Sequence, residues 1–491
     1  MALKIMMWNI EQFGTTRCKY PNRVDRISDI VAHEKPDVFV TLEVRTKDPA
    51  DAIDVADKIK NGLYNNHNLD YQYILTHYSF FEYYAYFYLD TVVPYTVATG
   101  GSVLYDYSNS LQNLTLVRAG NRLSTTNATV NNGTPLLKNH FPLLDYPGRA
   151  PQKTNEKNRR PPGAGFFKTT NSNEYFAVIT WHNETATQIK RKRGSEKGPM
   201  MGKGVVSMQR IAKAGFVQNS NLIVQVKENG TTSQRTFDQV IFTGDFNNDP
   251  TTNKNDFTGL GTFSHMVTNP THIHNYVDDE GEEFNELIHC LDNSLQSQSL
   301  AQNNNIKTKA DVFSLNLWLK DKKPGNACLK KMLQESWLGD KGALHRLAKE
   351  DALRGLDHYC DKRKYGTVYK EYKDEIIRKI LNQNLKAWVN KSQTKQTQQT
   401  FINDLNNNIL ANLQVKNRSS EEMTEIRKQL APVAGEVATI VKDYAKNFCH
   451  IVKRYELIKK NPDIIKSSEA LFLIRMILSD HLPVITTISN W

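Results

Sequence analysis

The spacing of apolar and polar positions divides the chain into a part with strand-like patterns and a part with helical patterns. Up to residue 298, short runs rich in β-branched and aromatic residues alternate with loops rich in Asn, Gly, Pro and Thr. Runs such as LKIMMWNI (3–10), DVFVTLEV (37–44) and QVIFTG (239–244) have the composition of strands. Helices are predicted near residues 22–34 and 50–63. This part of the chain therefore predicts a mainly strand-built α/β domain.

The second part begins after a polar stretch, SLAQNNNIKTK (299–309), which we interpret as a linker. Residues 325–431 contain no Pro, which is consistent with helices. Apolar residues over 440–458 recur at spacings of three and four, and this pattern predicts an amphipathic helix. The last residues, 476–491, again have the composition of a strand. We therefore predict a domain of residues 1–298 plus 476–491, interrupted by an all-α insert at 307–475.

Charge is concentrated in the same insert. Residues 307–475 carry 33 Lys and Arg against 20 Asp and Glu, whereas the rest of the chain carries 30 against 32. A strongly basic block beside a near-neutral remainder indicates binding to a polyanion. The alternative is a lysine-rich helical surface that is only solvated.

Composition excludes several other classes of protein. No run of 18 apolar residues predicts a membrane span, and the apolar N-terminus has the pattern of a first strand rather than of a signal peptide. The five cysteines are widely spaced without a CxxC pair, so neither a disulfide framework nor a zinc site is predicted. We expect a cytoplasmic protein without a membrane partner.

Carboxylate, amide and imidazole side chains follow several predicted strands. They are Asn9, Glu43, His182, Asp245, Asn247, Asp480 and His481. One such exit is an ordinary strand-to-turn transition, but repeated carboxylate, amide and imidazole groups at strand ends can converge on one rim of a sheet. Mg²⁺ prefers such oxygen ligands, and a pair of histidines can supply the acid and the base for phosphodiester cleavage.

In chain order, the motifs WN (8–9), LE (42–43), WH (181–182), GDFN (244–247) and SDH (479–481) resemble those of the endonuclease/exonuclease/phosphatase superfamily. Three further stretches, LEVRTKD (42–48), EYYAYFY (82–88) and RRPPGAGFF (159–167), are similar to the deoxyribonuclease I branch. The resemblance implies a four-layer α/β sandwich of two packed mixed β-sheets flanked by helices. It also implies an endonuclease that depends on Mg²⁺, with Mn²⁺ or Ca²⁺ as alternatives.

The resemblance also implies roles for individual residues. Metal ligands would be Glu43, Asp480 and Asn9, and catalytic residues would be His182, His481, Glu82, Asp292, Asp245 and Asn247. Glu82 would orient His182, and Asp292, in the loosest of the motif matches, would orient His481. Arg45 and Arg160 would contact the backbone or groove of the nucleic acid.

Two function classes follow, and the sequence leaves both open. The first is a Mg²⁺-dependent nuclease, with DNA expected over RNA, whose basic insert aids substrate binding or regulation. The second is a phosphoesterase of small or lipid phosphates whose insert binds a regulatory protein or a second copy of the chain. The HIH triplet at 272–274 has no surrounding ligands at zinc spacing and is predicted to be loop.

Overall fold

The computed structural model describes residues 2–98, 139–144, 160–183, 203–330 and 467–490 with short gaps inside these ranges, residues 419–430, and positions 458 and 460. The chain divides into two compact units. The first comprises Met1–Tyr276, Asn285–Cys328 and Ala470–Trp491, and the second comprises Val277–Phe284 and Leu329–Glu469. Nearly all of the helix predicted over 440–458 lies outside the described residues.

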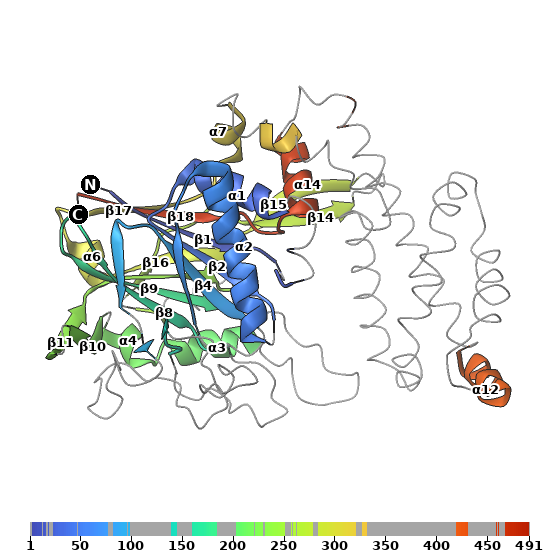
Figure 1. Ribbon diagram of the computed structural model, residues 1–491, viewed down its shortest axis with the longest axis horizontal. Coiled ribbons are helices and arrows are strands. Elements are labelled where there is room, and N and C mark those ends of the chain that lie inside the picture. Colours follow the sequence, from blue (N-terminus) through green and yellow to red (C-terminus); the bar gives the residue numbers. More distant parts are fainter. Residues whose placement is uncertain are drawn as a thin grey trace. The chain divides into compact units, whose positions relative to one another are not determined.

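The first sheet of the first unit joins strands from both ends of the chain (Figure 1). Its order is β17 (Lys307–Val312), β18 (Val484–Ser489), β1 (Leu3–Asn9), β2 (Val38–Val44), β4 (Tyr83–Tyr88) and β3 (Gln72–Leu75). Strands β1 and β2 are parallel, and the other neighbours are antiparallel.

The second sheet is also mixed. Its order is β13 (Phe263–His265), β16 (Asp292–Ser297), β12 (Gln239–Asp245), β9 (Tyr175–His182), β8 (Gly163–Thr169) and β5 (Val92–Tyr95). The central strands β12 and β9 run parallel, and their other neighbours are antiparallel. Each sheet therefore has one parallel pair near its centre.

Small two-stranded sheets complete the strand inventory of the described residues. They pair β6 (Val97–Ala98) with β7 (Asn139–His140), β10 (Leu222–Glu228) with β11 (Thr231–Phe237), and β14 (His272–Val277) with β15 (Glu283–His289). The described helices also include α12 (Ser420–Leu430) and α14 (Ser467–Ile477). Among the described helices, none is long and apolar enough to cross a membrane.

The two six-stranded sheets pack face to face. Alternate residues of β1 and β2, including Leu3, Ile5, Val38 and Val40, form one buried cluster with residues of the second sheet. Period-two alternation places these side chains on one face of each strand, so the shared cluster is the sandwich core. Ser294 and Thr486 also share a hydrogen bond of 2.7 Å between their hydroxyls across the sheets.

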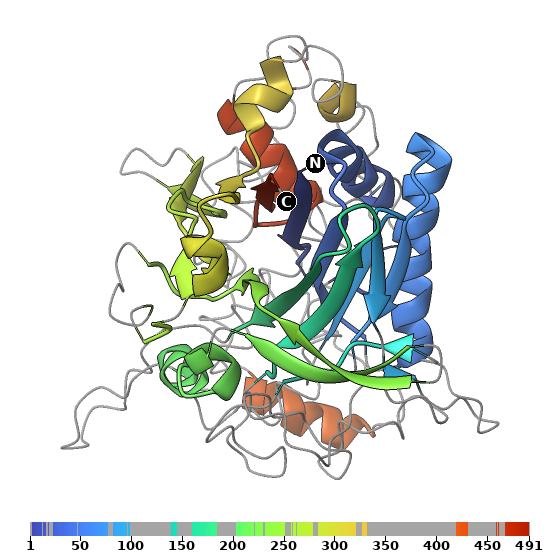
Figure 2. The same ribbon diagram turned by 90° about the vertical axis from the view of Figure 1, so that its left-hand side faces the viewer.

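Helices cover the outer faces of both sheets (Figures 1 and 2). Helices α1 (Arg23–Glu34) and α2 (Pro49–His67) lie beside the first sheet, and α3 (Lys203–Ile211) and α4 (Gly215–Asn219) contribute to a cluster on the second sheet. The predicted arrangement of two packed mixed sheets flanked by helices is confirmed.

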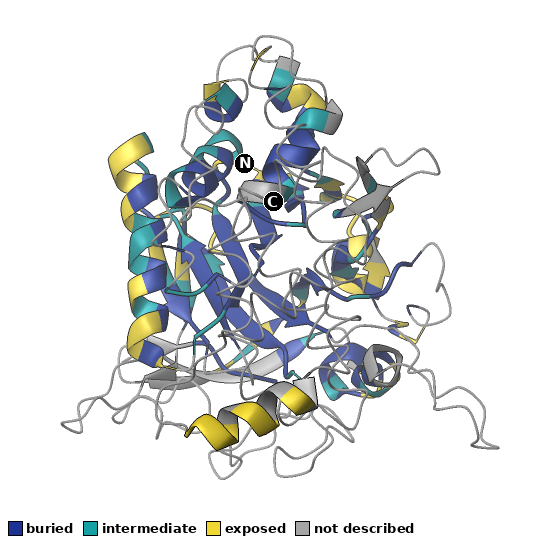
Figure 3. Cartoon of the chain, turned by 90° about the vertical axis from the view of Figure 1, so that its right-hand side faces the viewer, coloured by how far each residue is buried: buried dark blue, intermediate teal, exposed yellow. Residues whose placement is uncertain are grey.

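The residues of helix α2 determine where the helix begins, where it ends and which of its faces is buried. Asp48 accepts a hydrogen bond of 2.9 Å from the backbone N–H of Ala50, Pro49 occupies the first turn, and Asn68 ends the helix in the left-handed conformation. Residues spaced by three and four are buried, and the opposite side of the helix is exposed (Figure 3). The helix thus covers the first sheet with its apolar stripe.

The prediction that residues 299–309 form a linker is wrong. Gln298–Gln302 forms helix α6, and Lys307–Val312 forms β17, which pairs with β18 at the edge of the first sheet. In β17 only Ala310 is buried, because an edge strand exposes most of its side chains. The first unit therefore extends through α7 (Leu315–Lys320) to Cys328, past the boundary predicted at residue 307.

Gly244 allows the close approach of the two parallel strands at the end of β12. Its φ is +155°, and a Cβ atom there would lie 1.9 Å from the carbonyl oxygen of Trp181 on β9. We expect Gly244→Ala to lower the free energy of unfolding by at least about 1–3 kcal/mol. Urea denaturation followed by circular dichroism measures this loss. Ser264→Ala, at an exposed position of the same sheet, is the control, and equal stability of the two variants would contradict the argument.

Candidate active site

Strand direction brings polar side chains from both sheets to one rim. Strand β1 ends at Asn9, Glu43 is the next-to-last residue of its parallel neighbour β2, and the parallel strands β9 and β12 end at His182 and Asp245. Antiparallel neighbours begin where these strands end, as the pairing of Asp245 with Asp292 shows. For the same reason Glu82 stands before β4, Arg160 before β8, and Asp480 and His481 before β18. Residues far apart in sequence therefore meet at one edge of the sandwich.

His182 is oriented by a fully buried carboxylate. Its Nδ1 lies 2.9 Å from Oε1 and 3.0 Å from Oε2 of Glu82. Nη1 of Arg160 lies 3.4 Å from the same Oε1. Burial alone would raise the pKa of Glu82, but the charges of His182 and Arg160 outweigh it and lower this pKa. Glu82 is thus held as a carboxylate that fixes the imidazole by its Nδ1.

His481 has an equivalent partner from the second sheet. Its Nδ1 lies 2.6 Å from Oδ2 of Asp292, whose side chain is completely buried. Burial disfavours the imidazolium, but the carboxylates of Asp292, Asp480 and Asp245 raise the pKa of His481 well above its ordinary value. The backbone of His481 is held as well, because Trp8 Nε1 donates a hydrogen bond of 2.8 Å to the carbonyl oxygen of His481.

Both histidines turn their second nitrogen toward the same oxygen atom. Oδ2 of Asp245 lies 3.6 Å from Nε2 of His182 and 3.8 Å from Nε2 of His481. Asn9 Nδ2 donates to this oxygen at 3.0 Å, and the backbone N–H of Asn247 donates to Oδ1 at 2.8 Å. Burial raises the pKa of Asp245, which the imidazole of His481 partly offsets. The two Nε2 atoms therefore face one small polar region from opposite sheets.

Glu43 enters this region from a distorted strand end. Its φ is +61°, in the left-handed region that side chains rarely adopt, and the pairing of β2 with β4 shifts register between Thr41 and Val44. Phe13 donates its N–H to the carbonyl oxygen of Glu43 at 2.9 Å and accepts from Arg45 N–H at 3.2 Å. Oε1 of Glu43 lies 3.7 Å from Nε2 of His182. The bulge therefore directs the Glu43 carboxylate toward His182.

Arg45 and Arg160, both predicted to contact nucleic acid, differ in their surroundings. Nε of Arg45 lies 3.6 Å from Oε2 of Glu43, and its side chain is 35% exposed. The side chain of Arg160 is 11% exposed and pairs with Glu82. Arg45 is thus the more accessible of the two guanidinium groups.

Asp480 stands at the more open side of the same rim. Its Oδ1 lies 3.7 Å from Nε2 of His481, and its side chain is 22% exposed. Burial and the nearby charge of Glu11 raise the pKa of Asp480 to about 6, with a smaller contribution from Glu43. Ser479 ties this loop to β1, because its hydroxyl donates to the carbonyl oxygen of Asn9 at 2.5 Å.

The residues at this rim fit a hydrated divalent cation. The charges of Glu11 and Glu43 lie near the Asp480 carboxylate and both contribute to its raised pKa. Hard oxygen donors gathered at a partly open edge suit Mg²⁺. The Asn9 amide, predicted to be a ligand, donates to Asp245 and accepts the N–H of Glu11 at 3.1 Å. Its role as a ligand stays a prediction.

Two residues at the rim, Glu11 and His272, were not predicted from the sequence. Glu11 lacked a signal because it follows β1 at a position without a recognised motif. His272, in the triplet predicted to be loop, instead begins β14 and forms an antiparallel bridge with His481. The paired histidines of HIH were the available signal, but the residues that complete their surroundings lie more than 200 positions away in the chain.

The pairing of Asp292 with His481 can be tested by an isosteric change. We expect Asp292→Asn to lower turnover of a phosphodiester substrate by about 10²-fold or more, because the neutral amide stabilises the imidazolium poorly. Affinity for nucleic acid, measured by gel shift, should not fall. Asp311→Asn on exposed β17 is the matched control. Equal activity of the Asp292 variant and the unaltered protein would show that another group orients His481.

Comparisons with known proteins give matches by structure only. No family model matches the chain, and no curated protein sequence matches it. An endonuclease/exonuclease/phosphatase family protein from Bacteroides thetaiotaomicron matches with 15% identity, a TM-score of 0.32, and coverage of 64% of this chain and 88% of that one.

Two further solved structures match at a similar level. A mannosyl-6-phosphatase from the same organism has 15% identity, a TM-score of 0.33, and coverage of 63% of this chain and 89% of that one. The human Nocturnin catalytic domain with bound sulfate has 13% identity, a TM-score of 0.29, and coverage of 63% and 85%.

Proposed function

We propose that this chain is a divalent-metal-dependent phosphoesterase of the endonuclease/exonuclease/phosphatase superfamily that hydrolyses phosphodiester bonds of nucleic acid. The observation that carries the proposal is the paired arrangement of His182 and His481. Each has a buried carboxylate on Nδ1, and both direct Nε2 toward Oδ2 of Asp245. Two imidazoles fixed on opposite sides of one polar region can divide the acid and base roles of a displacement at phosphorus.

The roles of the other residues follow from their contacts. Glu82 and Asp292 would hold the two histidines in one tautomer and stabilise their protonated forms. Asp245, Asn247 and Asn9 form a hydrogen-bonded group that would position the attacking water and the scissile phosphate. Glu43 and Asp480 would hold Mg²⁺, which supplies Lewis-acid stabilisation of the negative charge on phosphate oxygens. Arg45 would contact the substrate backbone.

Nucleic acid is the proposed substrate class because of the charge distribution. In the second unit, Leu329–Glu469 carries 27 Lys and Arg against 18 Asp and Glu, and Val277–Phe284 adds five Asp and Glu. A polyanion offers many phosphates to such a segment, whereas a small phosphate ester offers only one or two. We propose DNA before RNA on the motif resemblance to the deoxyribonuclease I branch.

The first experiment compares substrates directly. Purified full-length protein is incubated with supercoiled plasmid, linear DNA, RNA, bis-p-nitrophenyl phosphate and p-nitrophenyl phosphate, each with Mg²⁺ or with EDTA. Metal-dependent cleavage of a nucleic acid supports the proposal, and nicking of the plasmid identifies internal cuts. Hydrolysis of the monoester alone would favour a phosphatase of small or lipid phosphates. Cleavage of no phosphate ester would overturn the proposal.

A basic helical face in the insert provides the test of its role. At 100° per residue, Lys442, Lys446 and Lys453 of the predicted helix lie opposite its apolar stripe. We expect reversal of all three to Glu to weaken binding of nucleic acid and to reduce the slope of log affinity against log salt by up to about 3, because each lost phosphate contact removes about 0.9. Gel shifts at several salt concentrations measure this slope.

The matched control reverses three lysines of the first unit, Lys35, Lys307 and Lys309, which are exposed. It makes the same change in net charge away from the insert. If the insert only binds a regulator or a second copy of the chain, the insert variant and the control will have the same affinity and the same salt slope.

A further inference from the structure

The start of β14 is bound to the loop that carries Asp480 and His481. Ile273 donates its N–H to the carbonyl oxygen of Asp480 at 2.7 Å, and Leu482 donates to the carbonyl oxygen of Thr271 at 2.9 Å. His272 and His481 form an antiparallel bridge between these two bonds. Directly opposed residues of an antiparallel pair project to the same face. Backbone pairing therefore sets the His272 imidazole beside the candidate active site.

Other contacts hold this segment in place. Arg475 on α14 donates from Nη1 to the carbonyl oxygen of Ile273. Thr271 accepts the N–H of Asp292 on its hydroxyl at 3.0 Å, so the same segment also braces the carboxylate partner of His481. A side chain on such a fixed backbone is preorganised, which is the condition for a ligand of a bound ion.

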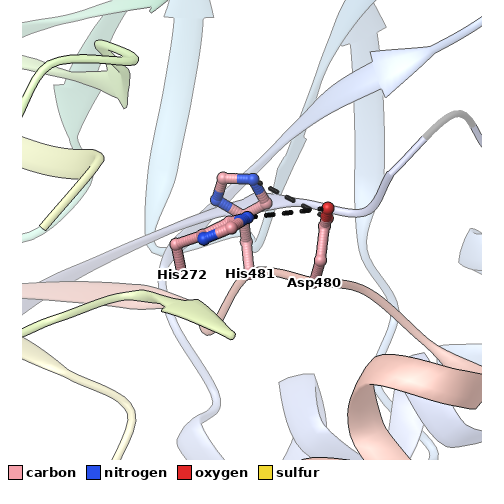
Figure 4. Close-up of side chains that lie close together, drawn as sticks. All are labelled: His272, Asp480 and His481. Atoms are coloured by element: carbon pink, nitrogen blue, oxygen red, sulfur yellow. Dashed lines mark ion pairs between the residues drawn. The ribbon is translucent and has the colours of Figure 1, made fainter. Parts of the chain in front are cut away.

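Asp480 lies beside two imidazoles and forms an ion pair with each (Figure 4). Oδ2 lies 3.9 Å from Nε2 of His272, and Oδ1 lies 3.7 Å from Nε2 of His481. The two imidazole rings are 5.2 Å apart at an angle of 66°. His272 and Asp480 are both partly exposed, with side-chain exposures of 19% and 22%, so this edge is open to solvent.

The separation of His272 from Asp480 is too long for a hydrogen bond and suits two ligands of one ion. Hydrogen bonds between nitrogen and oxygen have lengths of about 2.7–3.2 Å. Two ligand atoms that are each about 2.0–2.2 Å from a metal ion lie roughly 3–4 Å apart. A group made of His272, Asp480 and His481 has one potential ligand atom from each residue within 4.8 Å of the others.

We propose that His272 is an additional metal ligand, whose Nε2 joins the Asp480 carboxylate to bind a divalent transition-metal ion such as Mn²⁺ or Co²⁺ at the open edge of the active site. Nitrogen donors favour these ions, whereas Mg²⁺ prefers oxygen alone. His481 stays available for proton transfer, because its Nδ1 is held by Asp292. The proposal deepens the proposed function in naming the metal preference of the same site, and its test does not depend on cleavage.

The experiment measures Mn²⁺ binding to the full-length protein after removal of metals. Free Mn²⁺ is followed by electron paramagnetic resonance during titration of the unaltered protein and of His272→Ala. We expect Mn²⁺ affinity at one site to fall by about 10–100-fold in the variant. Mg²⁺ affinity, measured by its competition with Mn²⁺ in both proteins, should change much less. Co²⁺ absorption in the visible range gives a second readout, which should lose intensity when the imidazole is removed.

The matched control is His289→Ala. The ring of His289 lies 6.4 Å from that of His272, but its Nδ1 faces Asp249 at 3.6 Å. Its Mn²⁺ affinity should equal that of the unaltered protein. Should His272→Ala unfold, as circular dichroism would reveal, His272→Asn serves instead, because its shorter amide keeps a polar group at this position.

The outcomes separate this proposal from the proposed function. Equal Mn²⁺ affinity and stoichiometry in folded His272 variants and unaltered protein would overturn the assignment of His272, even if nucleic acid is cleaved. Weakened Mn²⁺ binding in these variants supports it, even if the substrate proves to be another phosphate ester. Equal loss of Mn²⁺ and Mg²⁺ affinity would contradict the claim that the imidazole sets the metal preference.

Discussion

Replacement of His481 by Ala is expected to lower phosphodiester cleavage by about 10²–10⁴-fold, the usual contribution of a positioned acid or base. Nε2 of His481 faces Asp245 Oδ2 at 3.8 Å, and Asp292 holds its Nδ1 at 2.6 Å. The truncation removes the proton-transfer group and leaves both carboxylates in place. Initial rates of plasmid nicking at saturating substrate measure the loss.

Two controls accompany this change. His67→Ala removes a partly exposed imidazole on α2 that pairs with Asp29, and it should leave the rate as it was. Thermal unfolding must show that the His481 variant is folded, because this histidine is buried and its backbone accepts a bond from Trp8. A folded variant with undiminished cleavage would remove His481 from the mechanism.

Removal of divalent metal is expected to abolish cleavage, and Glu43→Gln should reduce Mg²⁺-supported cleavage to near the level seen in EDTA. Several carboxylates gather at the rim, and burial together with the charge of Glu11 raises the pKa of Asp480 to about 6. A cation relieves this repulsion, and a neutral amide at position 43 weakens its binding. Nicking assays over a range of Mg²⁺ concentrations give the apparent metal affinity of each protein.

The shape of the metal titration distinguishes binding from chemistry. If Glu43 is a ligand, higher Mg²⁺ should recover part of the activity of Glu43→Gln, whereas no Mg²⁺ concentration should rescue His481→Ala. Glu34→Gln on α1, whose carboxylate pairs with Lys4, is the matched control for the loss of one acid group. Cleavage that continues unchanged in EDTA would rule out a metal-dependent mechanism.

Much of the fold follows from local patterns of apolar, polar and capping residues in the sequence. The strands β1, β2, β9 and β12 appear as apolar runs that end in polar side chains, and α2 has its own capping residues. Edge strand β17 was missed because its charged and polar side chains are exposed, which makes an edge strand resemble a linker. Local composition thus identifies buried strands well and exposed ones poorly.

The candidate site shows the same division. Glu43, His182, Asp245, Asp480 and His481 were singled out because each ends or precedes an apolar run, and short motifs in a set order linked them. Their pairing could not be derived from such runs, since Glu82 and His182, and Asp292 and His481, are separated by 100 and 189 positions. Motif resemblance supplied these pairs as expectations, and the contacts at 2.6–3.0 Å depend on the packing of two sheets.

By itself, the sequence determined which residues are strand ends, which side chains there can bind metal or transfer protons, and where the basic charge is concentrated. Only the tertiary structure decided that both Nε2 atoms face Asp245, that Glu43 turns inward at a bulge, and that His272 stands beside Asp480. The physical reason is that side-chain chemistry and strand periodicity are local properties of the chain. Convergence of side chains depends instead on sheet order, strand direction and register, which are set by contacts between distant segments.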